Sequence, residues 1–389
     1  MMRRAIWLLG SRLPASLRRL VKVVPGSQHV RAFATGRPGG PAPRPGTLRP
    51  VVYLPTWARW DVMRQRPQFL LEAFARAGHP VYFVDPRESA PRSVGGVSIV
   101  PSLDAVPAEH VILYLHFAPL SDLIERFADA IVIYDILDDL TIYESDEMGL
   151  PAERTVAHHH PLLMERADQA IVSNPVLAAR HRSERDDLIL IENGVDAQRF
   201  GTPMARPAEL PDLDAPLVGY RGAVAQWFDF DLLAAVAEAG PEWRFVLVGP
   251  VDARVAGDVD AVSALPNVEF IGERSPDAMA GYAQAFDVEA VWFVVDDLTQ
   301  GVTPLKVFES LAAGTPVVST PLPACDAIPG VRIAAEPAGF ADALLAAMQD
   351  GSDPEWRRQA AETADRADWK RRLEPLLRRL DDAKQRVVP

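Results

Sequence analysis

The sequence predicts an α/β protein with two domains, each a parallel β-sheet covered by helices. The chain has 389 residues, more than one hydrophobic core usually organises. Short apolar runs alternate with amphipathic stretches, a rhythm typical of parallel sheets with helical crossovers. This rhythm stops at residues 201–216, which contain four prolines, and then starts again. Two Rossmann-like halves joined by a proline-rich segment are the simplest explanation.

The elements follow one another in a regular order. In the first half, the expected strands are 51–54, 81–84, 111–116, 131–136, 170–173 and 188–191, with helices at 67–77 and 121–128. In the second half, the expected strands are 217–220, 244–249, 268–272, 288–294 and 316–320, with helices at 231–239, 275–285, 304–313 and 338–348. The charged tail, 365–387, has a helical apolar stripe and is expected to form a single helix. In such folds ligands bind at the carboxyl ends of the strands, here in a cleft between the domains.

Charge is distributed unevenly along the chain. Residues 1–49 hold ten Arg and Lys and no Asp or Glu, whereas the remainder has 30 basic and 53 acidic side chains, a net charge of −23. A body this acidic repels phosphate backbones, which argues against a nucleic-acid partner. The single cysteine, Cys325, excludes an internal disulfide and a cysteine-based zinc cluster, and it fits a reducing compartment.

The basic N-terminus has two interpretations. In residues 1–24, apolar residues recur with a helical period and arginines lie between them. The uncharged apolar stretch of this segment is too short to span a membrane. One interpretation is an interfacial helix on an anionic membrane. The other is a leader that is poorly ordered or packs on the body. Residues 34–50 are rich in Pro and Gly and are expected to form a flexible linker.

The stretch TQGVTPLKVFESLAAGTPVVST, residues 299–320, carries the most chemical information. Thr303 suits an N-cap, Pro304 the first helical position, and Gly314 the position beyond the helix end. The expected buried face consists of Leu305, Phe308, Leu311 and Ala312. The stretch therefore predicts a helix that follows a glycine-containing loop.

Two polar residues of this helix point to a nucleotide. Lys306 lies in the first turn, where a cation opposes the helix dipole, so its placement favours a phosphate bound at that end. Glu309, one turn further, would then accept hydrogen bonds from vicinal hydroxyls such as those of a ribose. The alternative is an ordinary capped surface helix.

This stretch resembles the nucleotide-sugar motif of family 4-type glycosyltransferases of the GT-B fold. Further motifs of that superfamily follow in the same order: MERADQAIVSNPVLAAR (164–180), ENGVD (192–196) with Phe200, LVGP (247–250) and NVEFIG (267–272). The sequence WDVMRQRPQ (60–68) is similar to a subgroup from bacterial polysaccharide clusters. The resemblance implies two Rossmann-like domains facing a central cleft, with a C-terminal helix crossing back to the N-terminal domain. The expected segments are a basic leader and linker 1–48, an acceptor domain 49–205, a nucleotide-sugar domain 206–364 and a C-terminal helix 365–389.

The resemblance implies transfer of a sugar from a nucleotide-diphosphate donor to a hydroxyl of a glycan or lipid-linked acceptor. It implies retention of configuration, no metal and no cofactor, in the cytoplasm or at the inner face of the membrane. The donor-binding residues that it suggests are Arg221, Gly222, Thr303, Lys306 and Glu309. The chain departs from the superfamily where the first of two glutamates is replaced by Gly301, and where only Arg221 matches the usual basic pair. In the subgroup, the lysine matching Lys306 is expected to replace the missing basic contact.

The first half offers further candidates. Arg64 and Arg66 open the first helix and are expected to bind a phosphate of the donor or of an anionic acceptor, the alternative being surface arginines. His116 ends a strand and resembles the histidine that many such transferases place near the reacting sugar; the alternative is a structural hydrogen bond. We expect His116 and Lys306 to be catalytic.

Two groups resemble metal ligands but are interpreted otherwise. Asp135, Asp138 and Asp139 form a carboxylate cluster, which in this class more often caps a turn at a strand end. His158–His160 lack an i,i+4 spacing or partner cysteines, so they are expected to face solvent. No metal is expected.

Two other functions stay open. A GT-B-fold epimerase also binds a nucleotide sugar, but needs several acids and histidines for proton chemistry. A catalytically silent partner in a membrane polysaccharide assembly complex fits Gly301 and the basic leader.

Overall fold

The computed structural model describes residues 36–54, 59–62, 64–138, 156–210 and 215–385, with side chains to residue 380. The leader expected at 1–24 and Asp139 lie outside these residues. The described chain divides into two compact units. The N-terminal unit contains the described residues up to 198 together with 296–309 and 362–385, and the C-terminal unit contains 199–295 and 310–361.

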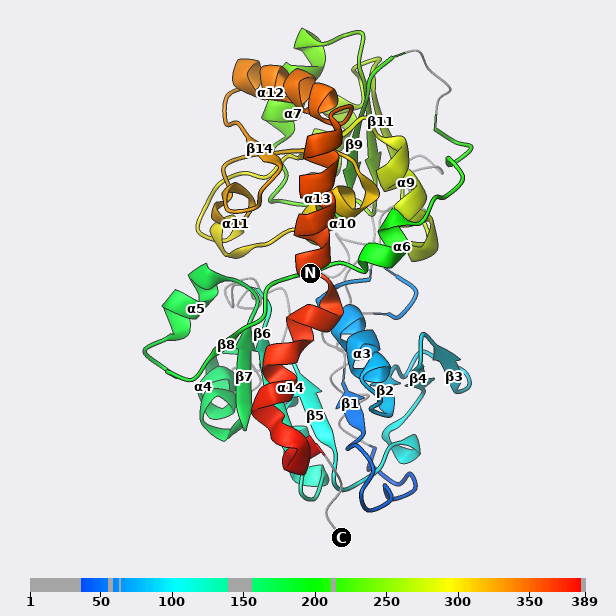
Figure 1. The fold of residues 1–389 in the computed structure, drawn as a ribbon, viewed down its shortest axis with the longest axis vertical. Helices are drawn as coiled ribbons and strands as arrows, with labels where there is room; N and C mark the ends of the chain where they lie inside the picture. Colours follow the sequence, from blue (N-terminus) through cyan, green and yellow to red (C-terminus); the bar gives the residue numbers. More distant parts are fainter. Residues whose placement is uncertain (1–35, 55–58, 63, 139–155, 211–214, 386–389) are drawn as a thin grey trace, which may run out of the picture. The chain divides into compact units, whose positions relative to one another are not determined.

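The N-terminal unit is built on an eight-stranded sheet (Figure 1). Its strand order is β3-β4-β2-β1-β5-β6-β7-β8, and every neighbouring pair is parallel except β3 with β4. The strands are β1 (Val51–Tyr53), β2 (Val81–Val84), β3 (Arg92–Val94), β4 (Val97–Val100), β5 (Ile112–Leu115), β6 (Ile131–Ile136), β7 (Gln169–Val172) and β8 (Ile189–Leu190). Because the order runs one way from β1 and the other way from β5, the topological switch point lies between these two strands.

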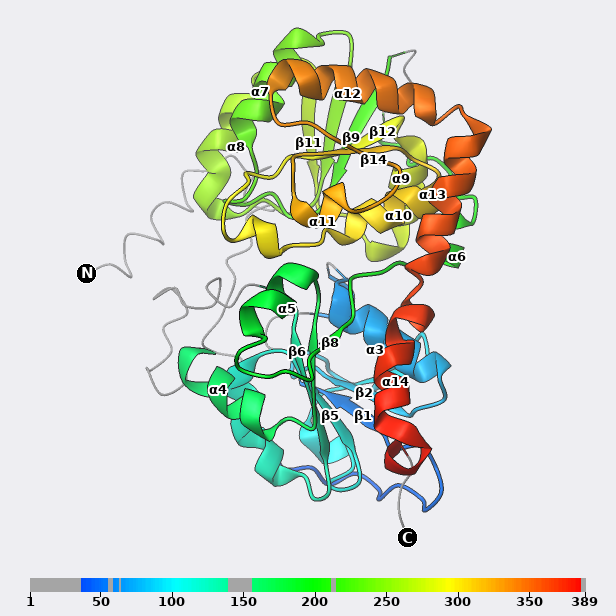
Figure 2. The same cartoon turned by 60° about the vertical axis from the view of Figure 1, so that its left-hand side comes forward.

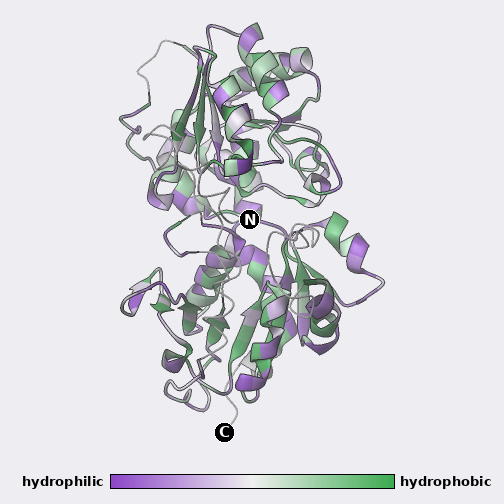
Figure 3. Ribbon diagram, turned by 180° about the vertical axis from the view of Figure 1, so that it is seen from behind, coloured by the Kyte–Doolittle hydropathy of each residue, from purple (hydrophilic) through white to green (hydrophobic). Residues whose placement is uncertain are grey.

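Helices cover both faces of this sheet. They are α3 (Arg66–Arg76), α4 (Val156–Arg166), α5 (Pro175–His181) and α14 (Trp369–Gln385), with 3₁₀ turns η2 (Leu103–Ala105) and η3 (Ala118–Arg126). Helix α6 (Ala197–Gly201) contains residues of both units. Strand β1 sends Val51 and Tyr53 into one core and Val52 into the other, as a strand of period two must. Both cores are apolar, which is visible as green strands in Figure 3.

Helix α14 packs on α3 over the N-terminal sheet. The indole of Trp369 stacks on the ring of Phe69, with centroids 5.7 Å apart and planes at 9°. Leu373, Leu376 and Leu380 of the same stripe are buried in that core. The C-terminal helix therefore belongs to the N-terminal unit, as the sequence predicted.

The C-terminal unit is built on a six-stranded, fully parallel sheet (Figure 2). Its order is β11-β10-β9-β12-β13-β14. The strands are β9 (Leu217–Arg221), β10 (Arg244–Val248), β11 (Val268–Gly272), β12 (Val288–Val291), β13 (Val317–Ser319) and β14 (Val331–Ile333). The helices within it are α7 (Phe230–Ala239), α8 (Ala256–Val262), α9 (Met279–Ala285), α11 (Pro323–Asp326) and α12 (Pro337–Asp350), with 3₁₀ turns η7 (Ala253–Val255) and η8 (Pro276–Ala278). Helices α10 (Leu305–Ala313) and α13 (Pro354–Arg366) contain residues of both units, and the 3₁₀ turn η9 (Thr299–Gly301) belongs to the N-terminal unit.

The two faces of the second sheet have separate coverings. On one face α7 and α12 pack together, and Phe340 of α12 stacks on Trp292 with ring centroids 4.6 Å apart. On the other face, Tyr282 of α9 and Phe286 pack against Val246 and Val248 of β10. This double covering explains the continuous apolar runs of the strands.

Every expected strand is present, with small differences at the ends. The hairpin strand β3, its partner β4 and the edge strand β14 were not predicted from the sequence. Strands β3 and β14 are three residues long and contain an arginine, whereas β4 is apolar but only four residues long. The stretch expected as a helix at 121–128 is the 3₁₀ segment η3. The helix expected at 365–387 is α14, which begins at Trp369, and the sequence missed the preceding helix α13.

The prediction that residues 34–50 form a flexible linker is wrong for residues 36–50, which the structure describes. The amides of Gly39 and Gly40 donate to the carbonyl oxygen of Val106 at 3.2 and 2.8 Å. Arg49 is buried, and its guanidinium donates to the backbone oxygen of Asp129 at 2.6 Å. Residues 36–50 are therefore attached to the N-terminal unit instead of forming a free tether.

Candidate functional site

Helix α10 carries the predicted nucleotide residues. It begins at Leu305, one residue later than expected, and ends before Gly314, whose φ of +77° is the left-handed conformation predicted for that position. The buried face is wider than the sequence indicated, since Lys306 and Val307 are buried beside Phe308, while Leu305 is only half-buried.

The start of α10 contains an unsatisfied polar atom. Thr303 is 5% exposed, and among the described residues its hydroxyl has no hydrogen-bond partner. The expected N-cap hydrogen bond is therefore not formed. A buried hydroxyl without a partner costs free energy, about 1–3 kcal/mol, which a ligand would recover.

A buried ion pair holds the other part of α10 to the sheet. Nη2 of Arg221, the last residue of β9, lies 2.7 Å from Oε2 of Glu289 on β12 and donates to the hydroxyl of Ser310 at 3.0 Å. The Ser310 hydroxyl also donates to that carboxylate. Arg221 therefore links two strands to α10, so the structure assigns it a positioning role; its contact with the donor stays a prediction.

The loop after β9 depends on glycine. Gly222 has φ +139° and donates its amide to the carbonyl of Val248 at 2.8 Å. Gly249, with φ +153°, lies against Gly222 so closely that an added Cβ would overlap the carbonyl oxygen of Gly222. Backbone thus meets backbone at the carboxyl ends of β9 and β10, where parallel sheets bind ligands.

Residues 296–309 are hydrogen-bonded to other segments of the N-terminal unit. The side-chain amide of Asn193, in the ENGVD motif, donates to the backbone oxygen of Thr303 at 2.7 Å. Asn174, the N-cap of α5, donates to the backbone oxygen of Gly301. Arg180 donates to the backbone oxygen of Asp297 at 2.9 Å. These bonds fix the loop that precedes α10 and were not apparent from the sequence.

A second buried ion pair lies at the carboxyl ends of the N-terminal strands. Nε of Arg66 lies 2.8 Å from Oδ2 of Asp135, which also accepts a hydrogen bond from Tyr114. Nη1 of Arg66 donates to the backbone oxygen of Ile191 at 2.6 Å. Burial acts to lower the pKa of Arg66, but the charges of Asp135, Tyr114 and Asp138 and the hydrogen bond with Asp135 together outweigh it, and the pKa is raised. Among the described residues Nη2 of Arg66 has no hydrogen-bond partner, so one donor remains for a ligand.

His116 directly follows β5, beside the topological switch point. Its Nδ1 lies 2.7 Å from the hydroxyl of Tyr53, and the two rings stack with centroids 5.5 Å apart. Burial lowers the pKa of His116 to about 4, although the charge of Asp135 acts in the opposite direction. The imidazole is therefore neutral at neutral pH.

The two described carboxylates of the predicted acidic cluster differ. Asp135 is fully buried and neutralised by Arg66. Burial, and then the charge of Asp135, raises the pKa of Asp138 to about 7, although Arg66 acts to lower it. Asp138 is therefore about half protonated at neutral pH, which suits a proton acceptor or donor.

The other predicted phosphate ligand, Arg64, is turned toward a carboxylate. Its Nη2 lies 2.5 Å from Oε1 of Glu72, and its guanidinium lies over the rings of Trp60 and Phe69 at 5.2 and 5.0 Å. A phosphate contact by Arg64 stays a prediction.

The histidines at 158–160 do not all face solvent, so that expectation is wrong for two of them. His158 is exposed, whereas His159 and His160 are buried. Nδ1 of His159 lies 2.7 Å from the hydroxyl of Ser121. The apolar pattern of α4 is too weak to show which side of the helix is buried.

Solved structures share this fold. A sucrose-phosphate synthase from Thermosynechococcus elongatus superposes with a TM-score of 0.63 at 17% identity, covering 86% of this chain and all of that one. HepE of Anabaena, solved with UDP and glucose, superposes with a TM-score of 0.58 at 13% identity, again covering 86% and 100%. Together with the two parallel-sheet units, these likenesses define the class: the chain has the GT-B fold of glycosyltransferases.

Sequence matches agree with this fold. Residues 217–350 match the family model described as Glycosyl transferases group 1. A protein of Bacillus subtilis described as a teichuronic acid biosynthesis glycosyltransferase, TuaH, is 30% identical over 203 residues. That match covers 49% of this chain and 51% of TuaH, so the chain spans about half the length of this relative. Among the described residues, no helix is long and apolar enough to span a bilayer.

Proposed function

We propose that this protein transfers a sugar from a nucleoside-diphosphate donor to a hydroxyl of a glycan or lipid-linked acceptor in cell-surface polysaccharide biosynthesis. The group 1 domain at 217–350 and the similarity to TuaH support this reaction class. The observation that carries the proposal is the start of α10, where the buried Lys306 lies three residues after Thr303, whose buried hydroxyl has no hydrogen-bond partner among the described residues.

In this proposal the donor diphosphate binds at the start of α10. Lys306, 9% exposed, is the cation in the first turn, and the helix dipole adds a favourable field for an anion. The hydroxyl of Thr303 gains its missing partner from a phosphate oxygen. Glu309 is half-buried one turn further and accepts hydrogen bonds from the ribose hydroxyls. Arg221 and Gly222 shape the neighbouring loop.

We infer that the leaving diphosphate is stabilised by Lys306 and the helix amides, because charge develops on its oxygens as the glycosidic bond breaks. The resemblance implies retention, with the leaving phosphate taking the proton of the acceptor hydroxyl. No metal is assigned to this step. A neutral His116 would bind a sugar hydroxyl by hydrogen bonding, since an imidazole with a pKa of about 4 is a weak base.

The acceptor would bind to the N-terminal unit. The remaining donor of Arg66, Nη2, is buried and has a fixed orientation, as recognition of a phosphate on a lipid-linked acceptor requires. Arg64 would join it only after leaving Glu72. The basic residues 1–24 would hold the protein on an anionic membrane at its cytoplasmic face, and deleting these residues would then release the protein from vesicles while sparing donor binding.

The experiment is a panel of nucleoside diphosphates followed by thermal unfolding. One nucleotide should raise the melting temperature, because a ligand of the native state stabilises it. Lys306→Ala and Glu309→Ala should each weaken its binding at least tenfold. Lys370→Ala, an exposed lysine on α14, is the matched control and should bind like the parent.

Turnover separates the candidate functions. Acceptor-dependent release of the nucleoside diphosphate supports the transferase. Conversion of the donor sugar without an acceptor would instead support an epimerase, and no binding of any nucleotide would leave the silent partner as the function.

A further inference from the structure

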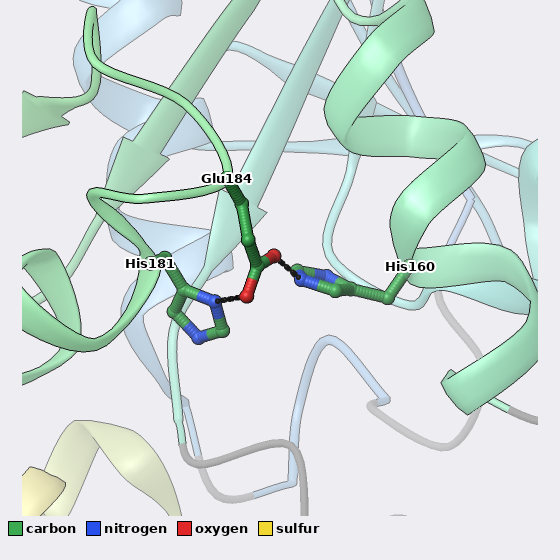
Figure 4. Close-up of side chains that lie close together, drawn as sticks. All are labelled: His160, His181 and Glu184. Atoms are coloured by element: carbon green, nitrogen blue, oxygen red, sulfur yellow. Dashed lines mark hydrogen bonds and ion pairs between the residues drawn. The ribbon is translucent and has the colours of Figure 1, made fainter.

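Two histidines and a glutamate meet in the N-terminal unit, apart from the residues assigned to the transfer reaction (Figure 4). His160 comes from α4, His181 is the last residue of α5, and Glu184 lies in the turn that follows. Nε2 of His160 lies 2.7 Å from Oε2 of Glu184, and Nδ1 of His181 lies 3.2 Å from Oε1. One ligand atom of each residue lies within 4.8 Å of the others.

We propose that His160, His181 and Glu184 bind a divalent transition-metal ion, with Zn²⁺ as the ion that fits this ligand set. Two imidazole nitrogens and one carboxylate are a recurrent zinc ligand set that leaves a fourth position open. Nitrogen-rich sites of this kind favour Zn²⁺ or Co²⁺ over Mg²⁺ or Ca²⁺, which prefer oxygen ligands.

The geometry needs only local adjustment. Zn–N and Zn–O bonds are about 2.0–2.1 Å, which places neighbouring ligand atoms roughly 3.3 Å apart in a tetrahedral site. The distance from His181 to Oε1 of Glu184, 3.2 Å, is close to that value, whereas the 2.7 Å between His160 and Oε2 must lengthen and the carboxylate must turn to present one oxygen to the ion. The two imidazole rings, with centroids 5.0 Å apart, are already at about the separation of two imidazoles on one tetrahedral ion. His181 and Glu184 lie at a helix end and in a turn, where such a shift does not disturb the sheet.

A buried tyrosine orients one of the ligands. The hydroxyl of Tyr134 on β6 lies 2.8 Å from Nδ1 of His160 and is itself fully buried. When Nε2 binds the metal, Nδ1 carries the proton and donates it to the tyrosine oxygen, which fixes the ring and its tautomer. Both imidazoles are neutral in the metal complex, so each shifts its proton to the other ring nitrogen.

The surroundings allow an ion to enter. His160 and His181 are buried, but the side chain of Glu184 is 42% exposed, so the cluster opens to solvent on the carboxylate side. The neighbouring Arg185 is turned away to Asp187, with Nε 2.5 Å from Oδ1. A bound ion would join the end of α5 to α4. Because α5 also carries Asn174 and Arg180, it would stabilise the helix that holds residues 297–301.

The direct experiment is a zinc titration of the full chain after treatment with a chelator, in competition with a chromophoric zinc indicator. We expect one Zn²⁺ per chain and a higher melting temperature in its presence. Co²⁺ should give the visible absorption of a low-symmetry site that includes nitrogen ligands. Zinc binding weaker than millimolar, or no Co²⁺ spectrum, would show that the cluster is only a hydrogen-bonded contact and would overturn the proposal.

Variants locate the site. His181→Ala and Glu184→Gln should each weaken zinc binding at least tenfold, and Tyr134→Phe should weaken it less. Glu184 is exposed, so its variant tests the site without risk to folding. The matched control is the double variant His158→Ala, Glu165→Gln, which removes two exposed side chains of the same helix and should bind zinc like the parent. Equal binding by the Glu184→Gln, His181→Ala double variant would place the metal elsewhere and refute the proposal.

Discussion

The guanidinium of Arg221 lies 2.7 Å from the carboxylate of Glu289, and both side chains are fully shielded from solvent. Because Ser310 bonds to both, this pair joins β9 and β12 to helix α10. A buried pair of charges is stable only while both partners are present, since either charge alone is left without compensation.

Replacing Arg221 with Met should therefore destabilise the protein strongly. We expect a loss of about 3–5 kcal/mol in the free energy of unfolding, because Glu289 would be left buried without its partner. Urea unfolding measures this. The matched control is Arg254→Met, which breaks a more exposed pair with Asp252 in the same unit and should cost less than about 1 kcal/mol. Similar losses in both variants would contradict the role assigned to the buried pair.

His116 should make stability depend on pH. Its folded pKa of about 4 lies below the usual value of 6.5, so the unfolded chain binds a proton more readily between these values. The stability that His116 contributes is complete above pH 6.5 and is lost as pH falls toward 4, by about 3 kcal/mol.

The test compares the parent with His116→Gln in urea at several pH values. As pH falls from 7 to 4, the parent should lose more unfolding free energy than the variant, so the difference between them should shrink. The control is His158→Gln, because the side chain of His158 is exposed. Its unfolding free energy should equal that of the parent at every pH. A constant difference between parent and His116→Gln would show that the imidazole is not kept neutral by burial.

Asp138 should make stability depend on pH in the opposite direction, so that its contribution falls as pH rises. Its folded pKa of about 7 is above the usual value, so the folded state holds the proton between about pH 4 and 7. The penalty for ionising it is absent below pH 4 and complete above pH 7. Asp138→Asn should therefore stabilise the protein most at pH 8 and lose that advantage at pH 4. The same urea series measures it, and a stabilisation that did not vary with pH would contradict this assignment.

Gly249 should not tolerate a side chain. An alanine Cβ there would overlap the carbonyl oxygen of Gly222, and φ of +153° is unfavourable for any other residue. We expect Gly249→Ala to cost more than about 2 kcal/mol and to weaken nucleotide binding, because the adjacent strand ends must move. Gly339→Ala is the control, since no atom lies within 4 Å of the added methyl group, and its unfolding midpoint should not fall.

The elements that could be predicted from the sequence are those that local patterns determine. Helix α10 and its Gly314 end were predictable because the cap residues and the apolar period are contained in fewer than twenty residues. The contacts of Arg66 with Asp135 and of Asn193 with Thr303 were not, because they join residues 69 and 110 positions apart without a local signal. The histidine–glutamate cluster was missed for the same reason, since its ligands come from two helices and a turn.

Asn193 should position the nucleotide loop without stabilising the fold greatly. Its amide donates to the backbone oxygen of Thr303 at 2.7 Å, next to the proposed diphosphate site. Asn193→Ala removes one hydrogen bond, worth about 0.5–1.5 kcal/mol, so nucleoside-diphosphate affinity should fall roughly 3- to 10-fold. Calorimetric titration measures the affinity, and urea unfolding checks that the fold remains. Arg76→Ala, which breaks the 2.5 Å ion pair with Asp196 of the same motif, is the control and should leave affinity unchanged. If both variants lose affinity equally, the whole motif segment rather than the Asn193 contact positions Thr303; if neither does, the loop is held by Asn174 and Arg180 alone.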